Sequence, residues 1–248
     1  MKRVLRQGLT VASLGGVAMM APAMATTTSQ VPFVVAVVLL LVFSLGVHEA
    51  AHAQVALWCG DTTARDLGRI TLNPIPHIDP FLTVILPAML AFTGAPIFGG
   101  AKPVPVRMDR LKGGMRDMAL VALAGPISNI LLALFFGVLW AYSRTVYSAE
   151  QLMPDILLTA VYFNVLLAVF NMIPIPPLDG SRVVTWLLPR ELRSSYDRLE
   201  RFGILIVFGL ILFVPAFGDL LWSGIGPVTQ IAQEFGMMVV EPFVGGIR

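Results

Sequence analysis

Residues 31–58 read VPFVVAVVLLLVFSLGVHEAAHAQVALW, and this stretch decides the fold class. No titratable side chain appears in it before His48, so its first seventeen residues form an uninterrupted run. An α-helix rises 1.5 Å per residue and needs ~20 residues to cross a hydrocarbon core of about 30 Å. The stretch therefore predicts a membrane-spanning helix, in which His48 lies about 26 Å along the axis from Val31.

The composition of the whole chain agrees with this prediction. Of its 248 residues, 56% are hydrophobic and only 13% are charged, against about 25% in soluble domains. These values exclude a soluble enzyme and a disordered chain. The net charge of +2 comes from cations that lie in loops rather than in one stripe, so we expect no nucleic-acid partner. The single cysteine, Cys59, cannot form an internal disulfide or a thiolate cluster, so a bound metal would need histidine and carboxylate ligands.

Three further apolar stretches are long enough to predict spans, at residues 118–142, 156–173 and 202–217. Residues 81–98 are apolar but short and contain two prolines, which predicts a re-entrant or interfacial segment. The loops at 99–116 and 174–201 each carry five lysines or arginines, which indicates the cytoplasmic side. We therefore predict an all-α polytopic membrane protein, with three core transmembrane helices, the re-entrant segment and a C-terminal transmembrane helix.

The same patterns divide the chain into three parts. Residues 1–30 begin with three cations and reach Ala23-Met24-Ala25, which predicts a signal peptide or an N-terminal membrane segment. Residues 31–185 are predicted to form the membrane core. Residues 186–248 comprise a cytoplasmic loop, the last transmembrane helix and an external tail, whose part from residue 225 could be an interfacial helix.

The pattern His48-Glu49-Ala50-Ala51-His52 carries the chemistry. Histidines at i and i+4 lie on one helical face, where they can bind one zinc ion while Glu49 acts as general base on the zinc-activated water. Ionisable groups inside a membrane helix are expensive, which favours a functional role. The alternative is a polar cluster that packs helices together.

A third zinc ligand is expected elsewhere, because catalytic zinc sites have three protein ligands. Asp179 follows the 156–173 span. It can lie on the same side of the membrane as the histidines if the chain makes one net crossing between the two helices, and the span at 118–142 supplies that crossing. This topology also requires residues 81–98 to return to the cytoplasmic side. Asn171 could donate its amide to a developing oxyanion, or could form a hydrogen bond that packs helices. His77 could approach the site, although a role in ordering its loop is favoured.

Three blocks of sequence resemble the site-2 protease family of intramembrane zinc metalloproteases, in its compact bacterial form without PDZ or CBS domains. They are the pattern at 48–52, the segment AGPISN at 124–129, and NMIPIPPLDG at 171–180. The resemblance implies that His48, His52 and Asp179 bind Zn²⁺, that Glu49 is the catalytic base, and that Asn171 contacts the substrate or the transition state. Gly125, Ser128 and Asn129, within the second block, are interpreted as permitting close helix approach, and a role in the chemistry is the alternative.

The sequence thus predicts an intramembrane zinc metalloprotease that hydrolyses a peptide bond within or near a transmembrane segment of another protein. Its expected surroundings are the lipid bilayer of a bacterial inner membrane, with the active site near the cytoplasmic side. An edge strand at residues 69–72 could pair with the extended substrate. The alternative is a zinc-binding membrane protein without hydrolysis, either a transporter or an inactive relative that binds transmembrane helices.

Overall fold

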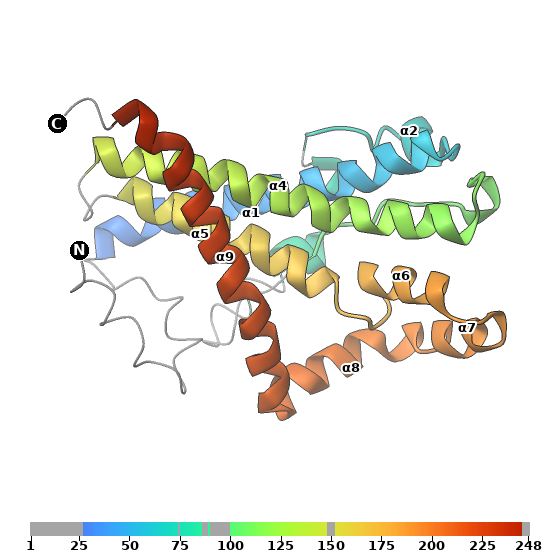
Figure 1. Cartoon of the computed structure of the whole chain (residues 1–248). Coiled ribbons are helices and arrows are strands. Elements are labelled where there is room, and N and C mark those ends of the chain that lie inside the picture. The colour runs from blue at the N-terminus through green and yellow to red at the C-terminus, as the bar shows by residue number, and fades with distance from the viewer. Residues whose placement is uncertain (1–26, 74, 86–88, 90–99, 148–151, 245–248) are drawn as a thin grey trace.

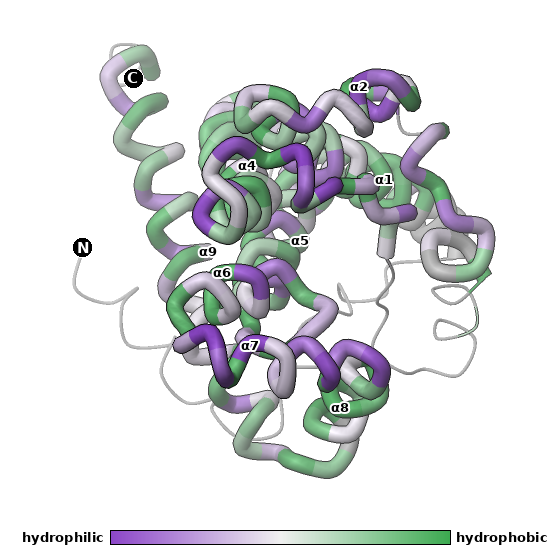
Figure 2. Tube along the Cα trace, turned by 90° about the vertical axis from the view of Figure 1, so that its right-hand side faces the viewer, coloured by the Kyte–Doolittle hydropathy of each residue, from purple (hydrophilic) through white to green (hydrophobic). Residues whose placement is uncertain are grey.

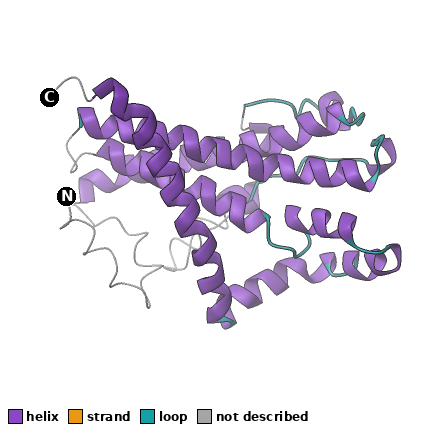
Figure 3. Cartoon of the chain, viewed as in Figure 1, coloured by secondary structure: helices purple, strands orange, loops and turns teal. Residues whose placement is uncertain are grey.

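The computed structural model describes residues 27–73, 75–85, 89, 100–147 and 152–244. The described chain is helical, with loops and no strand (Figure 3). The predicted signal peptide or first membrane segment lies almost entirely outside the described residues, as does most of the predicted re-entrant segment at 81–98. Of that segment, the structure describes the short π-helix η3 (Pro80–Ile85).

Three long helices form the centre of the protein: α1 (Thr27–Trp58), α4 (Met115–Val146) and α5 (Leu152–Asn171). Each contains a stretch that is long and apolar enough to cross a membrane, so the prediction of an all-α polytopic membrane protein is confirmed. They lie side by side, and α4 runs antiparallel to α1 and α5 (Figure 1). This arrangement brings the C-terminal ends of α1 and α5 to the same end of the bundle.

Small and branched side chains fill the interface between α4 and α5. Ala133 and Phe136 of α4 pack against Val161 and Val165 of α5, and all four are buried. In a membrane such packing stabilises helix association through van der Waals contact, because lipid tails are as apolar as the side chains. Complementary packing of apolar side chains therefore holds the helices of the bundle together. The few polar groups inside the bundle require a separate explanation.

The C-terminal part of the chain differs from the prediction of one span at 202–217. The structure divides this stretch between α8 (Glu200–Phe213) and α9 (Pro215–Val244), which meet at 90°. Val214 lies outside the helical region, with φ −122° and ψ 88°, because helical dihedral angles are disfavoured for the residue before a proline. Together, α8 and α9 can count as a fourth, broken span among the described helices.

Helix α9, rather than α8, packs along α4 and α5 (Figure 1). A side chain at Gly137 of α4 would collide with the Ala232 carbonyl of α9, and one at Gly236 would collide with the Gly137 carbonyl. The two backbones thus touch at small residues spaced i and i+4 on α9, a recurring contact between membrane helices. The stretch interpreted from sequence as an interfacial tail therefore covers the bundle.

Short helices surround the end of the bundle where α1 and α5 terminate. They are α2 (Thr63–Asp66), η2 (Ile75–His77), η4 (Met108–Arg110), α6 (Asp179–Leu187) and α7 (Arg190–Asp197). Figure 2 looks at this end of the molecule, where hydrophilic residues gather on α2, α7 and the start of α4. This polar end holds the candidate site.

Candidate active site

His48 and His52 lie in the last third of α1, one helical turn apart and both buried. The Nδ1 atom of each ring is already engaged on α4. His48 Nδ1 lies 2.6 Å from Asn129 Oδ1, and His52 Nδ1 lies 2.7 Å from the Val121 carbonyl oxygen. Each of these oxygens can only accept a hydrogen bond, so the neutral ring that faces it carries its proton on Nδ1 and leaves a lone pair on Nε2.

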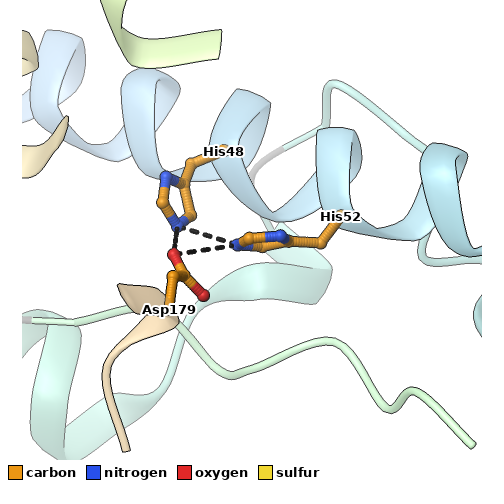
Figure 4. Close-up of side chains that lie close together, drawn as sticks. All are labelled: His48, His52 and Asp179. Carbon is orange, nitrogen blue, oxygen red and sulfur yellow. Dashed lines mark hydrogen bonds and ion pairs between the residues drawn. The ribbon is translucent and has the colours of Figure 1, made fainter. Parts of the chain in front are cut away.

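The two Nε2 lone pairs converge with a carboxylate oxygen of Asp179 (Figure 4). The separations are 3.0 Å between the two Nε2 atoms, and 3.2 Å and 3.4 Å from Oδ2 to the Nε2 atoms of His48 and His52. Oδ2 is buried without a hydrogen-bond donor. Three electron-pair donors this close repel one another unless a cation lies between them. A tetrahedral zinc ion with bonds of about 2.0–2.1 Å has ligand atoms about 3.3 Å apart, which these separations match.

Gly125 of α4 leaves room for this cluster. A Cβ atom there would overlap the imidazoles of both His48 and His52. Its absence keeps a small space beside the two Nε2 atoms. Gly125 therefore permits α4 to approach the two imidazoles themselves, in addition to the helix that carries them.

Asp179 reaches the cluster because the chain breaks sharply after α5. Three prolines at 174, 176 and 177 prevent a regular helix between α5 and α6. Gly180 then allows the start of α6 to lie directly against the end of α5, where a side chain would collide with the Met172 carbonyl. The Tyr196 hydroxyl donates a 2.8 Å hydrogen bond to the Pro174 carbonyl and holds the loop from the side of α7. The carboxylate is thus placed at the first residue of α6.

The carboxylate of Glu49 lies beside the cluster under an extended segment. Its Oε2 atom accepts a 2.8 Å hydrogen bond from the Val104 peptide N–H. The segment is held at both ends: the Lys102 N–H donates to the His77 carbonyl at 2.7 Å, and the Arg107 N–H donates to Asp61 at 2.6 Å. A metal-sized cluster with an adjacent, positioned carboxylate is the arrangement that zinc hydrolases use.

Comparison with known proteins identifies the family of the chain. The model of the peptidase family M50 matches residues 146–214. YwhC of Bacillus subtilis, classed by name among zinc metalloproteases, is 38% identical over 192 residues, which are 75% of this chain and 83% of YwhC. The chain belongs to peptidase family M50. It is a zinc metalloprotease built from membrane-spanning helices.

Other relatives match a smaller part of the chain. Rip2 of Mycolicibacterium smegmatis, named in the same way, is 31% identical over 178 residues, which are 70% of this chain and 64% of Rip2. MJ0611 of Methanocaldococcus jannaschii is 39% identical over 66 residues, which are 27% of this chain and 32% of MJ0611. No solved structure gives a significant match to the chain.

Two further residues singled out from the M50 sequence lie outside the cluster. The Asn171 amide donates a 3.0 Å hydrogen bond to the Leu167 carbonyl of its own helix. His77 is buried, and its ring Nε2 lies 3.2 Å from the Thr71 carbonyl oxygen. Because its own carbonyl also accepts from Lys102, His77 ties the loop at 71–77 to the segment that covers Glu49.

Sequence reasoning missed two groups of this M50 site. Val104 acts through its peptide N–H, which every residue but proline carries, so only its position between Pro103 and Pro105 distinguishes it. Asn129 was interpreted as a residue of helix packing, whereas the structure places its side chain on His48. An uncharged amide within a membrane helix, four residues after Gly125, was the available signal.

Proposed function

We propose that this M50 zinc metalloprotease hydrolyses a peptide bond within or near a transmembrane segment of a membrane-protein substrate. His48, His52 and Asp179 would hold the zinc ion. The observation that carries this proposal is the convergence of two Nε2 lone pairs and an unsatisfied carboxylate oxygen at separations of 3.0–3.4 Å. A bound zinc ion supplies Lewis-acid chemistry, which activates water and polarises the scissile carbonyl.

Glu49 is the proposed general base and acid. It follows His48 directly in α1, and its carboxylate is nearly buried beside the cluster. In this role it takes a proton from the attacking water and later delivers it to the leaving nitrogen of the peptide. The hydrogen bond from Val104 occupies Oε2 and leaves Oε1 for that proton. Asn171 is proposed as a substrate contact, which requires its amide to leave the Leu167 carbonyl.

The substrate is proposed to bind in an extended form beside α1. Ile70, Thr71 and Leu72 line an open cavity of about 340 Å³ together with residues 47, 50, 51 and 54 of α1. Residues 69–72 form no strand in the described chain, where the Arg69 N–H donates to the Ala64 carbonyl and the Thr71 carbonyl faces His77, so they pair with no neighbouring strand. An extended substrate could supply that neighbour through backbone hydrogen bonds. Thr71→Pro removes one backbone donor and should slow cleavage, while unchanged cleavage would exclude this binding mode.

The proposed membrane is the bacterial inner membrane, with the site near its cytoplasmic face. The cation-rich loop before α4 supports this orientation, because positive charges favour the cytoplasm. Cys59, the single cysteine of the chain, is partly exposed directly after α1 and provides a test. A thiol reagent that cannot cross membranes should label Cys59 in inverted vesicles and not in intact cells. The reverse pattern would place the site on the outer side.

The protease proposal is tested by comparing membrane-protein fragments from cells that express the wild type or Glu49→Gln. New termini inside transmembrane segments, found by mass spectrometry only with the wild type, are the expected result. Glu191→Gln is the matched control, because Glu191 is exposed on α7. Equal zinc contents with identical fragments would instead favour a zinc-binding protein without hydrolysis.

A further inference from the structure

A chain of buried polar side chains runs from His48 across three helices. Asn129 of α4 accepts from His48 Nδ1 and donates to Asn164 Oδ1 of α5 at 3.0 Å. The Asn164 amide donates to Ser44 Oγ of α1 at 3.0 Å and to the Ala160 carbonyl at 2.9 Å. Asn129 and Asn164 are completely buried, and Ser44 is 1% exposed. These are the polar groups that the apolar packing of the bundle leaves to be explained.

The Ala160 carbonyl fixes the direction of every bond in this chain. A carbonyl oxygen can only accept, so the Asn164 amide nitrogen must face it. The Asn164 oxygen must then face Asn129, which has to donate its own N–H there. The Asn129 oxygen is consequently left for His48, whose Nδ1 must carry the proton. Reversing either amide would place two donors or two acceptors face to face inside the bundle, at a cost of about 1–3 kcal/mol.

We propose that Asn129 and Asn164 are positioning residues for the metal site, and that they hold His48 in the tautomer whose Nε2 lone pair faces Asp179. This proposal rests on the proposed ligand set. His52 reaches the same tautomer by a shorter route, through the Val121 carbonyl of α4. His52 is thus oriented by a backbone carbonyl, whereas His48 is oriented by two hydrogen-bonded side-chain amides in series. Neighbours that orient zinc-ligating histidines typically change metal affinity 10- to 100-fold when removed.

The competing explanation is that the two amides only fasten the helices together, as polar side chains do in membrane bundles. Two substitutions at position 129 separate the explanations. Asn129→Leu removes the acceptor for His48. Asn129→Asp keeps an acceptor for His48 and loses the donor to Asn164, so it breaks the bond between helices α4 and α5 while preserving the contact with the ligand.

The experiment measures zinc affinity of the purified full-length chain in detergent, by competition with a chelator. Asn129→Leu should bind zinc 10- to 100-fold more weakly, Asn164→Leu should show a smaller loss, and Asn129→Asp should stay within about threefold of the wild type. Ser143→Ala is the matched control, because Ser143 is a buried polar residue of α4 whose hydroxyl donates to the Trp140 carbonyl of the same helix. The thermal stability of the metal-free protein is measured in parallel and should fall for both variants at position 129, because each loses the N–H that bonds to Asn164.

Nitrogen-15 NMR of the histidine rings adds a readout that a packing role would not change. The chain has only three histidines, so single substitutions assign each ring. His48 of the metal-free wild type should carry its proton on Nδ1, and Asn164→Leu should produce a mixture of tautomers. Zinc binding by Asn129→Leu equal to that of the wild type, or a wild-type proton on Nε2, would overturn the proposal. Failure of the ligand set is recognised separately, because His48→Ala would then bind zinc as the wild type does.

Discussion

The peptide N–H of Val104 donates a 2.8 Å hydrogen bond to the Oε2 atom of Glu49, across 55 positions of sequence. Pro103 and Pro105 have no N–H, so Val104 is the one backbone donor among these three consecutive residues. The contact holds the carboxylate in a fixed orientation beside His48, His52 and Asp179. The segment that contains Val104 is therefore part of the candidate active site, although it contributes no side chain to the proposed chemistry.

Replacing this N–H should impair catalysis and leave zinc binding intact. Val104→Pro removes the donor, and a hydrogen bond to a charged group contributes about 1.5–3 kcal/mol, so we expect kcat to fall about 10- to 100-fold. Val104→Ala keeps the N–H and is the matched control. The measurement is the cleavage rate of a substrate segment found in the fragment comparison, with zinc content determined in parallel. Equal rates for the two variants would show that Val104 does not position Glu49.

A side chain at position 125 should weaken zinc binding. In Gly125→Ala the new methyl group overlaps both imidazoles, and overpacking of this kind costs about 1–3 kcal/mol. Zinc affinity should therefore fall about tenfold or more. Gly209→Ala serves as the control, because a Cβ atom at that helical position has open space around it. If Gly125→Ala bound zinc as tightly as this control, the close approach of α4 at Gly125 would not determine the positions of the two imidazoles.

The parts of this site that sequence could predict are those determined by local geometry and by topology. His48 and His52 share a helical face because they are four residues apart, and the position of Asp179 follows from the number of membrane crossings between it and α1. The hydrogen-bond partners of these groups depend instead on how helices rotate against one another. That rotation is set by van der Waals contacts spread over many residues. No single sequence motif encodes these contacts, so the partners could not be predicted.

The C-terminal helices illustrate a second limit. The hydropathy of residues 202–217 predicts one span, but a proline at position 215 breaks the stretch before it can cross as a single helix. Which of the resulting halves packs on the bundle is decided by Gly137 and Gly236, which permit backbone contact between α4 and α9. Glycines allow two helices to pack closely only when small residues of both helices lie at the same level along the contact. This coincidence depends on the three-dimensional packing and cannot be read from the sequence.

A larger residue at the contact between α4 and α9 should destabilise the protein. Gly236→Ala places a methyl group against the Gly137 carbonyl, which we expect to cost about 1–3 kcal/mol. The thermal unfolding temperature in detergent should fall accordingly. Gly218→Ala on the same helix is the control, since a Cβ atom there meets nothing and alanine favours the helix. Equal unfolding temperatures for the two variants would mean that α9 is not held at this crossing.

Acid should release the segment that covers Glu49, because Asp61 anchors it. Burial alone would raise the pKa of the Asp61 carboxyl, but hydrogen bonds from the Thr63 hydroxyl and from the peptide N–H groups of Thr63 and Arg107 hold this pKa below its ordinary value. A carboxyl whose pKa is lowered by folding stabilises the folded state only while it is ionised. Its contribution is complete above the ordinary pKa of about 3.9 and is lost as the pH falls through the lower folded-state pKa.

The variant Asp61→Asn isolates this contribution. It removes the charge while keeping the size of the side chain. At pH 7 its free energy of unfolding should therefore be about 1–3 kcal/mol lower than that of the wild type, and its unfolding temperature should be lower as well. The difference between the two proteins should stay constant down to about pH 5 and disappear as the pH falls below the pKa of Asp61. Asp66→Asn is the control, because the Asp66 carboxyl is exposed on α2 and bonds only to its neighbours Thr62 and Arg65. A gap between wild type and Asp61→Asn that persisted unchanged in acid would show that the ionised carboxylate does not hold the Arg107 end of the segment.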